Sequence, residues 1–156
     1  MSLTVDTVVP AQINAATAAD SAGGRRADCR LMAAVRFAVT RYCRARLGCG
    51  DHAAEVAHTV CRMVAAVRPD AGDEATLTAF VYRTAAAAVN TAVAAGGADA
   101  AGLPGQLALL PADQREVLVL RVAVGLSVEQ AAVALGATPD AVRHVQHRAL
   151  QQLRTA

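Results

Sequence analysis

The sequence predicts an all-α protein, and three observations support this prediction. Of the 156 residues, 39 are alanine, which has the highest intrinsic helix propensity. Aromatic residues make up only 3% of the chain, and there is one isoleucine, so residues that favour strands are scarce. Apolar residues recur at helical spacing in several segments, and glycines separate those segments. We expect two small helical domains joined by a short linker.

The sequence begins with a predicted leader and a basic helix. Residues 1–24 are mostly small and polar and end in two glycines, so we expect a flexible leader. Residues 25–47 carry seven arginines and predict the first helix, which Gly48 and Gly50 end. The apolar residues of this helix recur at helical spacing: Leu31, Val35, Val39, Tyr42 and Leu47.

Two further helices complete the first predicted domain, 25–95. One is predicted at about 52–67, with Asp51 as its N-cap. Its predicted apolar stripe comprises Val56, Val60, Met63, Val64 and Val67. The other is predicted at about 75–95. Its larger apolar side chains are Leu77, Phe80, Val81 and Val89. Residues 96–105 contain four glycines and a proline and are predicted to form the linker.

The last part of the sequence, 106–156, predicts a helix-turn-helix domain. A helix over 113–124 follows a proline and ends at Gly125. Ser127 is the predicted N-cap of a short helix that ends at Gly136. Thr138 is the predicted cap of a final helix over 139–154, which has proline at its first position. A short helix, a turn with glycine and a longer helix are typical of a helix-turn-helix.

The final helix has two distinct faces. One face comprises Val142, Val145, Ala149 and Leu153, which we expect to pack against Ala131, Ala132 and Leu135. The opposite face carries hydrogen-bond donors suited to phosphates and base edges: Arg143, His144, His147, Arg148 and Gln151. With Thr138, these residues are the candidate DNA contacts. The alternative interpretation is a solvated polar face, which any surface helix has.

Several segments match a known family. Residues 110–154 read LPADQREVLVLRVAVGLSVEQAAVALGATPDAVRHVQHRALQQLR. This segment resembles region 4 of sigma-70-family RNA polymerase sigma factors, without gaps. Upstream, RYCRARLG at 41–48, EVAHTVC at 55–61 and AFVYRTAAAAV at 79–89 resemble region 2 of the extracytoplasmic-function group. These segments are most similar to the actinobacterial sigma-D-like branch.

The resemblance implies a function in transcription initiation with core RNA polymerase and promoter DNA as partners. Region 4 of such factors reads the −35 element and docks on the β flap, and region 2 binds the β′ coiled coil and opens the −10 element. The residues that the resemblance implies for polymerase contact are Arg41, Arg44, Asp51 and Glu55 in region 2, and Leu118, Leu120 and Leu126 in region 4. An anti-sigma factor is a further implied partner.

Region 2 departs from the family pattern at two places. The usual acidic run is reduced to Asp51 and Glu55, and the usual Gln-Glu pair reads His58-Thr59. The third helix lacks the usual Asp and Arg residues, and the chain has no arginine between Arg83 and Arg115. A surface that holds a separated strand needs cations and aromatic side chains. We therefore expect weak or absent opening of the −10 element.

Other functions fit the sequence less well. With 15 basic and 13 acidic residues, the chain is no general polyanion binder. It lacks a catalytic triad motif, a phosphate-binding glycine loop and a carboxylate pair with a pocket signature, so we expect no enzymatic activity and no cofactor. The four cysteines are Cys29, Cys43, Cys49 and Cys61. Two Cys/His pairs, Cys49–His52 and His58–Cys61, have spacing compatible with zinc, but we expect free thiols and no metal.

The sequence has no secretion signal and no apolar run long enough to span a membrane, so we expect a cytoplasmic protein. Three alternative functions remain open at this point. They are a stand-alone helix-turn-helix regulator, a sigma-like protein that binds polymerase or an anti-sigma factor without initiating, and a metal- or redox-responsive regulator.

Overall fold

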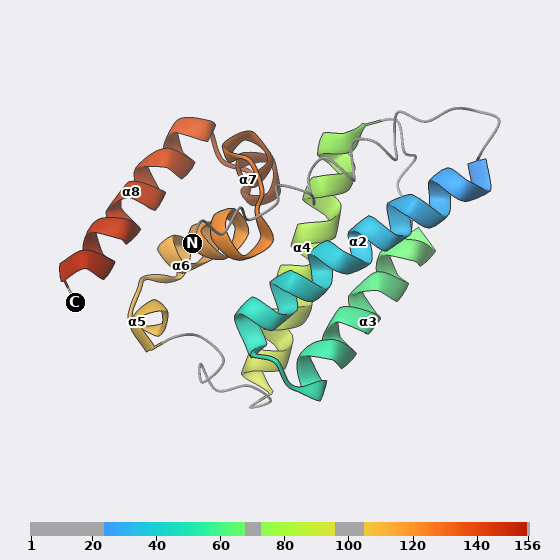
Figure 1. Ribbon diagram of the computed structural model, residues 1–156, viewed down its shortest axis with the longest axis horizontal. Coiled ribbons are helices and arrows are strands. Elements are labelled where there is room, and N and C mark those ends of the chain that lie inside the picture. Colours follow the sequence, from blue (N-terminus) through green and yellow to red (C-terminus); the bar gives the residue numbers. More distant parts are fainter. Residues whose placement is uncertain (1–23, 68–72, 96–104, 156) are drawn as a thin grey trace, which may run out of the picture.

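The computed structural model describes residues 24–67, 73–95 and 105–155, and in these ranges the chain forms helices and no strands. Three long helices come first: α2 (Gly24–Leu47), α3 (Asp51–Val67) and α4 (Glu74–Ala94). The remaining elements are α5 (Gly105–Ala108), α6 (Ala112–Leu118), the π-helix η2 (Val119–Val124), α7 (Val128–Leu135) and α8 (Pro139–Thr155). Figure 1 shows α2 to α4 packed together on one side, and α5 to α8 on the other. We call these groups the three-helix half and the helix-turn-helix half. The all-α prediction is confirmed.

α2 buries the stripe that its sequence predicts. Leu31, Val35, Val39, Tyr42 and Leu47 are all buried. Alanines at 34 and 38 lie on the same face and are also buried, which lets α3 and α4 pack closely against α2. The helix ends at Gly48, whose φ of 88° lies in the left-handed region that glycine adopts without strain.

α3 faces the core with only part of its predicted stripe, since Val60 and Val64 are buried as predicted. Small side chains supply most of its buried face: Ala53, Ala57, Val60, Cys61 and Val64. Met63 and Val67 are 48% and 65% exposed, which corrects their assignment to the core stripe. The alanines and the cysteine follow helical spacing, so they form a continuous face that packs closely against α2.

α4 begins at Glu74, one residue before the predicted start. The Asp73 carboxylate accepts hydrogen bonds from the backbone N–H groups of Ala75 and Thr76, which caps the helix. Leu77, Val81 and Val89 are buried, while Phe80 is only partly buried. The glycines expected to end this helix lie outside the described residues, as do residues 1–23 of the predicted leader and 96–104 of the predicted linker. Gly24, predicted as the end of the leader, begins α2.

The helix predicted over 113–124 is two elements, α6 and the π-helix η2. Gly125 has a φ of 87°, and its N–H donates to the carbonyl of Leu120, five residues earlier. Hydrogen bonds over five residues define a π-helix, so the last turn holds an extra residue. Gly105, which was predicted in the linker, begins the short helix α5.

One apolar core runs through both halves. α4 packs against α7, and α2 packs against η2. Buried residues from η2 and α7, including Leu120, Val124 and Ala131, share this core with Val39 and Val89 of the three-helix half. A second, small cluster of Leu110, Leu118 and Ala149 lies within the helix-turn-helix half. The division into two domains at 95 and 106 stays a prediction.

Candidate nucleic-acid interface

The turn between α7 and α8 is fixed by three local devices. Ser127 and Gln130 form a capping box: the Ser127 Oγ accepts from the Gln130 N–H at 3.1 Å, and the Gln130 Oε1 accepts from the Ser127 N–H at 3.0 Å. Gly136 ends α7 with a φ of 64°. Thr138 caps α8, since its Oγ1 accepts from the Ala141 N–H at 3.2 Å. The predicted caps Ser127 and Thr138 are therefore confirmed.

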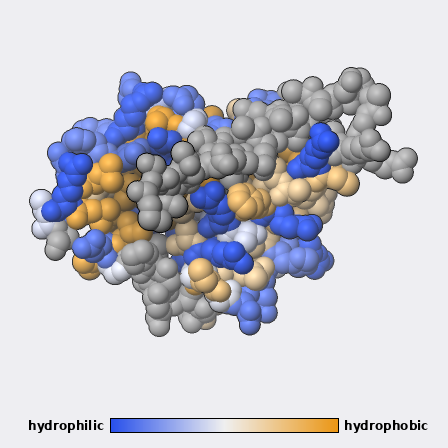
Figure 2. Space-filling view, viewed as in Figure 1, coloured by the Kyte–Doolittle hydropathy of each residue, from blue (hydrophilic) through white to orange (hydrophobic). Residues whose placement is uncertain are grey.

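α8 separates apolar and polar side chains onto opposite faces. Val142 and Ala149 are buried, and Val145 and Leu153 are partly buried against the core clusters. The predicted DNA-contact face is exposed along its whole length: Thr138, Arg143, His144, His147, Arg148 and Gln151. In the space-filling view, hydrophilic side chains line the edge of the molecule along which α8 runs (Figure 2). This face is free to meet a flat or grooved partner.

One predicted packing partner of α8 lies elsewhere. Leu135, the last residue of α7, is 36% exposed and lines a cavity with Arg46 and Tyr82 of the three-helix half. Its side chain therefore belongs to the contact between α7 and α4, which corrects its assignment to the α8 packing. Ala131 and Ala132 are buried, as expected for the close crossing of α7 and α8.

Arg143 has two acidic neighbours. Its guanidinium pairs with Asp140 at 2.8 Å and with Glu129 of α7 at 3.3 Å. Hydrogen bonds from the backbone N–H of Glu129 and from Ser127 hold the pKa of the Glu129 carboxyl below its usual range, and Arg143 lowers it further. Both pairs are well exposed to solvent, so water weakens them. A phosphate or base acceptor at Arg143 would replace these carboxylates.

The other donors on this face have no such competition. Within the described residues, the side chains of His144, His147 and Arg148 make no hydrogen bond or ion pair. Arg148 lies one turn beyond His144, on the same side of α8. Arg148 can therefore donate to a ligand without first leaving an intramolecular partner.

Arg121, which the sequence reasoning missed, holds α8 in place. It lies in the π-helix, and its Nε donates to Gln146 Oε1 of α8 at 3.1 Å. Its Nη1 donates to the carbonyl of Leu126, just before the α7 cap. One side chain therefore ties together η2, the start of α7 and the middle of α8. No local pattern could have predicted this, because Gln146 is 25 residues away.

The end of α4 offers a different surface. Its last two turns expose Asn90, Thr91 and Val93, with no arginine beyond Arg83. Tyr82, an aromatic residue of the same helix, is 3% exposed. The exposed side chains here supply neither a cation for phosphate nor an aromatic ring for bases.

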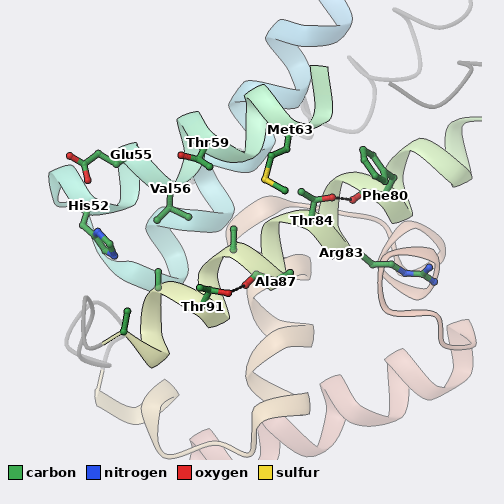
Figure 3. A pocket seen from close by; sticks show the side chains of 13 residues that line it. His52, Glu55, Val56, Thr59, Met63, Phe80, Arg83, Thr84, Ala87 and Thr91 are labelled. Carbon is green, nitrogen blue, oxygen red and sulfur yellow. Dashed lines mark hydrogen bonds between the residues drawn. The ribbon is translucent and has the colours of Figure 1, made fainter. Parts of the chain in front are cut away.

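An apolar groove runs between α3 and α4. It encloses about 810 Å³, and Figure 3 shows Val56 and Met63 of α3 on one wall, facing α4. Alanines of α4 form much of the opposite wall, and Glu55 lies on the rim. Arg83 extends away from the groove (Figure 3). Its guanidinium lies beside Gly136, in the turn before α8.

The comparisons with known proteins agree with this geometry. Residues 103–153 match the family model described as Sigma-70, region 4. The chain is 38% identical to the ECF RNA polymerase sigma factor SigD of Mycobacterium tuberculosis H37Rv, and the match covers 92% of this chain and 82% of that protein. SigD of Mycobacterium bovis matches with the same identity and coverage.

The chain belongs to the ECF sigma factors of the sigma-70 family. A shorter match to the ECF sigma factor ShbA of Streptomyces griseus is 59% identical over 36% of this sigma factor and 29% of ShbA. The structure of CnrH in complex with the cytosolic domain of CnrY has a TM-score of 0.64, 22% identity and 96% coverage of both chains. That likeness supports the shared fold. The sequence resemblance to an ECF sigma factor is confirmed.

The region 2 contact candidates of the sigma factor differ in exposure. Arg44, Asp51 and Glu55 are exposed near the α2–α3 turn. Arg41 is partly buried, and its guanidinium lies over the Phe37 ring at 5.7 Å from the centroid. Such cation–π contacts hold a side chain against its own helix. Arg41 therefore has less freedom to reach a partner than Arg44.

The three leucines expected on the polymerase side of region 4 lie in the interior. Leu118, Leu120 and Leu126 are 4%, 1% and 2% exposed. Leu120 and Leu126 lie in the core shared by both halves, and Leu118 packs in the small cluster with Leu110 and Ala149, so none of the three reaches the surface. This corrects their assignment as contact residues. Leu109 is 80% exposed and Leu150 is 39% exposed, and these are apolar side chains that the helix-turn-helix half presents to solvent.

The cysteines of the sigma factor are free thiols. Cys43 and Cys61 are buried, whereas Cys29 and Cys49 are exposed. Burial raises the pKa of the Cys43 thiol to about 12 and also raises the pKa of Cys61. Across the described ranges, no three His, Cys, Asp or Glu side chains gather closely enough to hold a metal ion. In the same ranges, no helix has the length and apolar character needed to cross a membrane.

Proposed function

We propose that this sigma factor directs core RNA polymerase to promoters, with α8 reading the −35 element. The observation that carries the proposal is the exposed donor face of α8, from Thr138 to Gln151, on a helix fixed by its caps and by Arg121. A recognition helix enters the major groove with its N-terminal part. Arginine and histidine donors there match guanine and phosphate acceptors.

The two halves have separate parts in this proposal. The helix-turn-helix half acts as the region 4 domain, over 106–156, and the three-helix half acts as the region 2 domain, over 25–95. Arg44, Asp51 and Glu55 are proposed as polymerase contacts, because they are exposed and match the positions implied by the family. The protein acts without catalysing a reaction of its own, and it works in the cytoplasm, where the polymerase is.

We also propose a protein inhibitor of the anti-sigma class as a partner. The structural neighbour CnrH was solved with a bound protein, the cytosolic domain of CnrY. A partner that covers an exposed apolar groove such as the one between α3 and α4 would remove that surface from water. Purified sigma factor alone would then be the active form.

The experiment that tests the main proposal has two parts. The first is gel filtration with core polymerase from a GC-rich actinobacterium, in which we expect co-elution. The second is fluorescence anisotropy with a duplex that carries a −35 element and with a scrambled duplex. Preference for the first duplex supports recognition by α8. Co-elution without any DNA preference would contradict it.

A second candidate function is a protein that binds polymerase but opens promoters poorly. The exposed end of α4, with Thr91 and Val93 where strand contacts are needed, favours it. Permanganate reactivity of −10 thymines distinguishes the two functions. Strong reactivity in the presence of polymerase would contradict weak opening, and its absence would support this second function.

A further inference from the structure

Four polar side chains meet at the seam between the two halves. Tyr42 and Arg46 come from α2, Asn90 comes from α4 and Glu116 comes from α6 of the helix-turn-helix half. The Tyr42 hydroxyl donates to Glu116 Oε1 at 2.5 Å, and Arg46 forms an ion pair with Glu116 Oε2. The second amino group of Arg46 donates to Asn90 Oδ1 at 3.2 Å. We call this group the seam cluster.

Three of the four side chains of the seam cluster are shielded from water, and Asn90 is exposed at its edge. The side chains of Arg46 and Glu116 are 15% and 17% exposed, and Tyr42 is fully buried. Burial and the Glu116 charge raise the pKa of Tyr42, so the hydroxyl stays protonated and remains a donor. Both Glu116 oxygens are used, which satisfies a carboxylate that would otherwise be costly to bury.

Much of the rest of the seam is apolar. Val89 and Ala85 of α4 are buried in the same core as Ala131 and Ala134 of α7. Apolar burial is non-directional, so these contacts specify the orientation of the two halves less sharply than hydrogen bonds do. The seam cluster does have fixed geometry, because a carboxylate must meet both a hydroxyl and a guanidinium. It therefore selects one arrangement of the two halves.

We propose that Tyr42, Arg46, Asn90 and Glu116 form a polar latch that holds the helix-turn-helix half closed over one face of α4. In the closed state, α6 and α7 cover the side of α4 that carries Tyr82 and Ala86. This face can meet another molecule only after the latch opens. The outer face of α8 contributes nothing to the latch, so it stays accessible in both states.

The consequence for transcription rests on the proposed function. A chain that must open before α4 meets its partner binds that partner more weakly by the fraction of open molecules. Loss of the latch therefore strengthens association with core polymerase, while affinity for an isolated −35 duplex stays the same. The latch and the proposed function are thus measured by different readouts.

A charge exchange tests the latch in the full chain. Arg46→Glu places two carboxylates together, and Glu116→Arg places two guanidiniums together. The double exchange restores an opposite pair. Small-angle X-ray scattering measures the radius of gyration, about 15 Å for a compact chain of this length. We expect each single variant to raise it measurably and the double variant to lower it again.

The matched control is the pair Arg143–Glu129, which lies entirely within the helix-turn-helix half. We expect exchange of these charges to leave the radius of gyration unchanged, because this pair does not join the two halves. Circular dichroism verifies that the helices persist. If a charge exchange unfolds the chain, Glu116→Gln and Tyr42→Phe provide milder tests with the same expected direction.

Three outcomes would overturn the latch. Single variants that stay as compact as the wild type would show that the apolar seam alone closes the molecule. A double variant that stays expanded would show that the pair does not act through its charges. An expanded variant that binds core polymerase no better would remove the regulatory consequence. Failure of the wild-type chain to bind polymerase would contradict the proposed function and leave the scattering result intact.

Discussion

α4 and α8 are both long surface helices, and each buries alanine against the core, yet their outer faces differ. α8 exposes Arg143, His144, His147, Arg148 and Gln151. The last turns of α4 expose asparagine, threonine, valine and alanine. α4 packs against α2, α3 and α7, whereas α8 packs against α6 and α7. The comparison favours the outer face of α8, which carries the hydrogen-bond donors, as the proposed DNA contact.

The largest expected effect comes from a carboxylate on the buried side of α8. Val142 is 1% exposed, so Val142→Asp buries an unpaired charge and should lower the free energy of unfolding by about 3–5 kcal/mol. Urea unfolding followed by circular dichroism measures the change. The matched variant on α4 is Val93→Asp, at a position that is 44% exposed, with an expected change within about 0.5 kcal/mol. Equal losses of unfolding free energy in Val142→Asp and Val93→Asp would contradict the assignment of Val142 to the buried face of α8.

The outer face of α8 is tested by Arg148→Ala. Arg148 is exposed and has no intramolecular partner among the described residues, so its whole interaction is available to DNA. We expect a loss of about 1–3 kcal/mol in binding to a −35 duplex if it contacts a base. Fluorescence anisotropy measures it. The control is Arg62→Ala, at an exposed position of α3, which should leave the affinity for DNA unchanged. A neutral Arg148→Ala would mean that this face is only solvated.

A smaller effect comes from the helix caps. Thr138→Ala removes the hydrogen bond to the Ala141 N–H and should lower the free energy of unfolding by about 1 kcal/mol. It should also weaken DNA binding if the N-terminal end of α8, where Thr138 lies, enters the groove as proposed. The corresponding change on α4, Asp73→Ala, removes a similar cap and should leave DNA affinity unaltered. Weaker DNA binding by both variants would contradict the proposal that α8, and not α4, contacts the −35 duplex.

The last prediction concerns alkaline pH, which acts on the three-helix half. Burial raises the pKa of Cys43 from 9.0 to about 12. The folded chain holds this proton more tightly than the unfolded chain does. The resulting stability is therefore complete below about pH 9 and is lost as the pH rises toward 12. Urea unfolding across this range measures the loss, which should be reduced in Cys43→Ala. Cys49→Ala, at an exposed position, should show the same loss of stability as the wild type. An equally large loss in Cys43→Ala would contradict this assignment.

Local sequence patterns predicted the helices and the exposed polar face of α8. Caps such as Ser127 and Thr138 depend on residues only three positions apart, so they can be read directly from the chain. The buried face of α3 could not be predicted in this way, because alanine and cysteine pack there while Met63 remains exposed. Hydropathy alone favours methionine for the core. The fit between neighbouring helices decides otherwise.

Contacts between distant residues explain the other differences. Glu116 lies 70 residues from Arg46, and no spacing rule connects them. The leucines at 118, 120 and 126 have the apolar character of an interface, but the same character suits a core. The family resemblance placed them in a region that binds polymerase. Only their burial showed that they support that region from inside.

The π-helix Val119–Val124 has a consequence for how this protein can evolve. Each helical residue turns the chain by about 100°, so one extra residue rotates everything after it by that angle. Deletion of Val122, which is 65% exposed, would remove little packing yet swing α7 and α8 around the axis of α6. Point substitutions can change which bases α8 prefers. A change in the direction in which α8 faces requires a residue to be gained or lost.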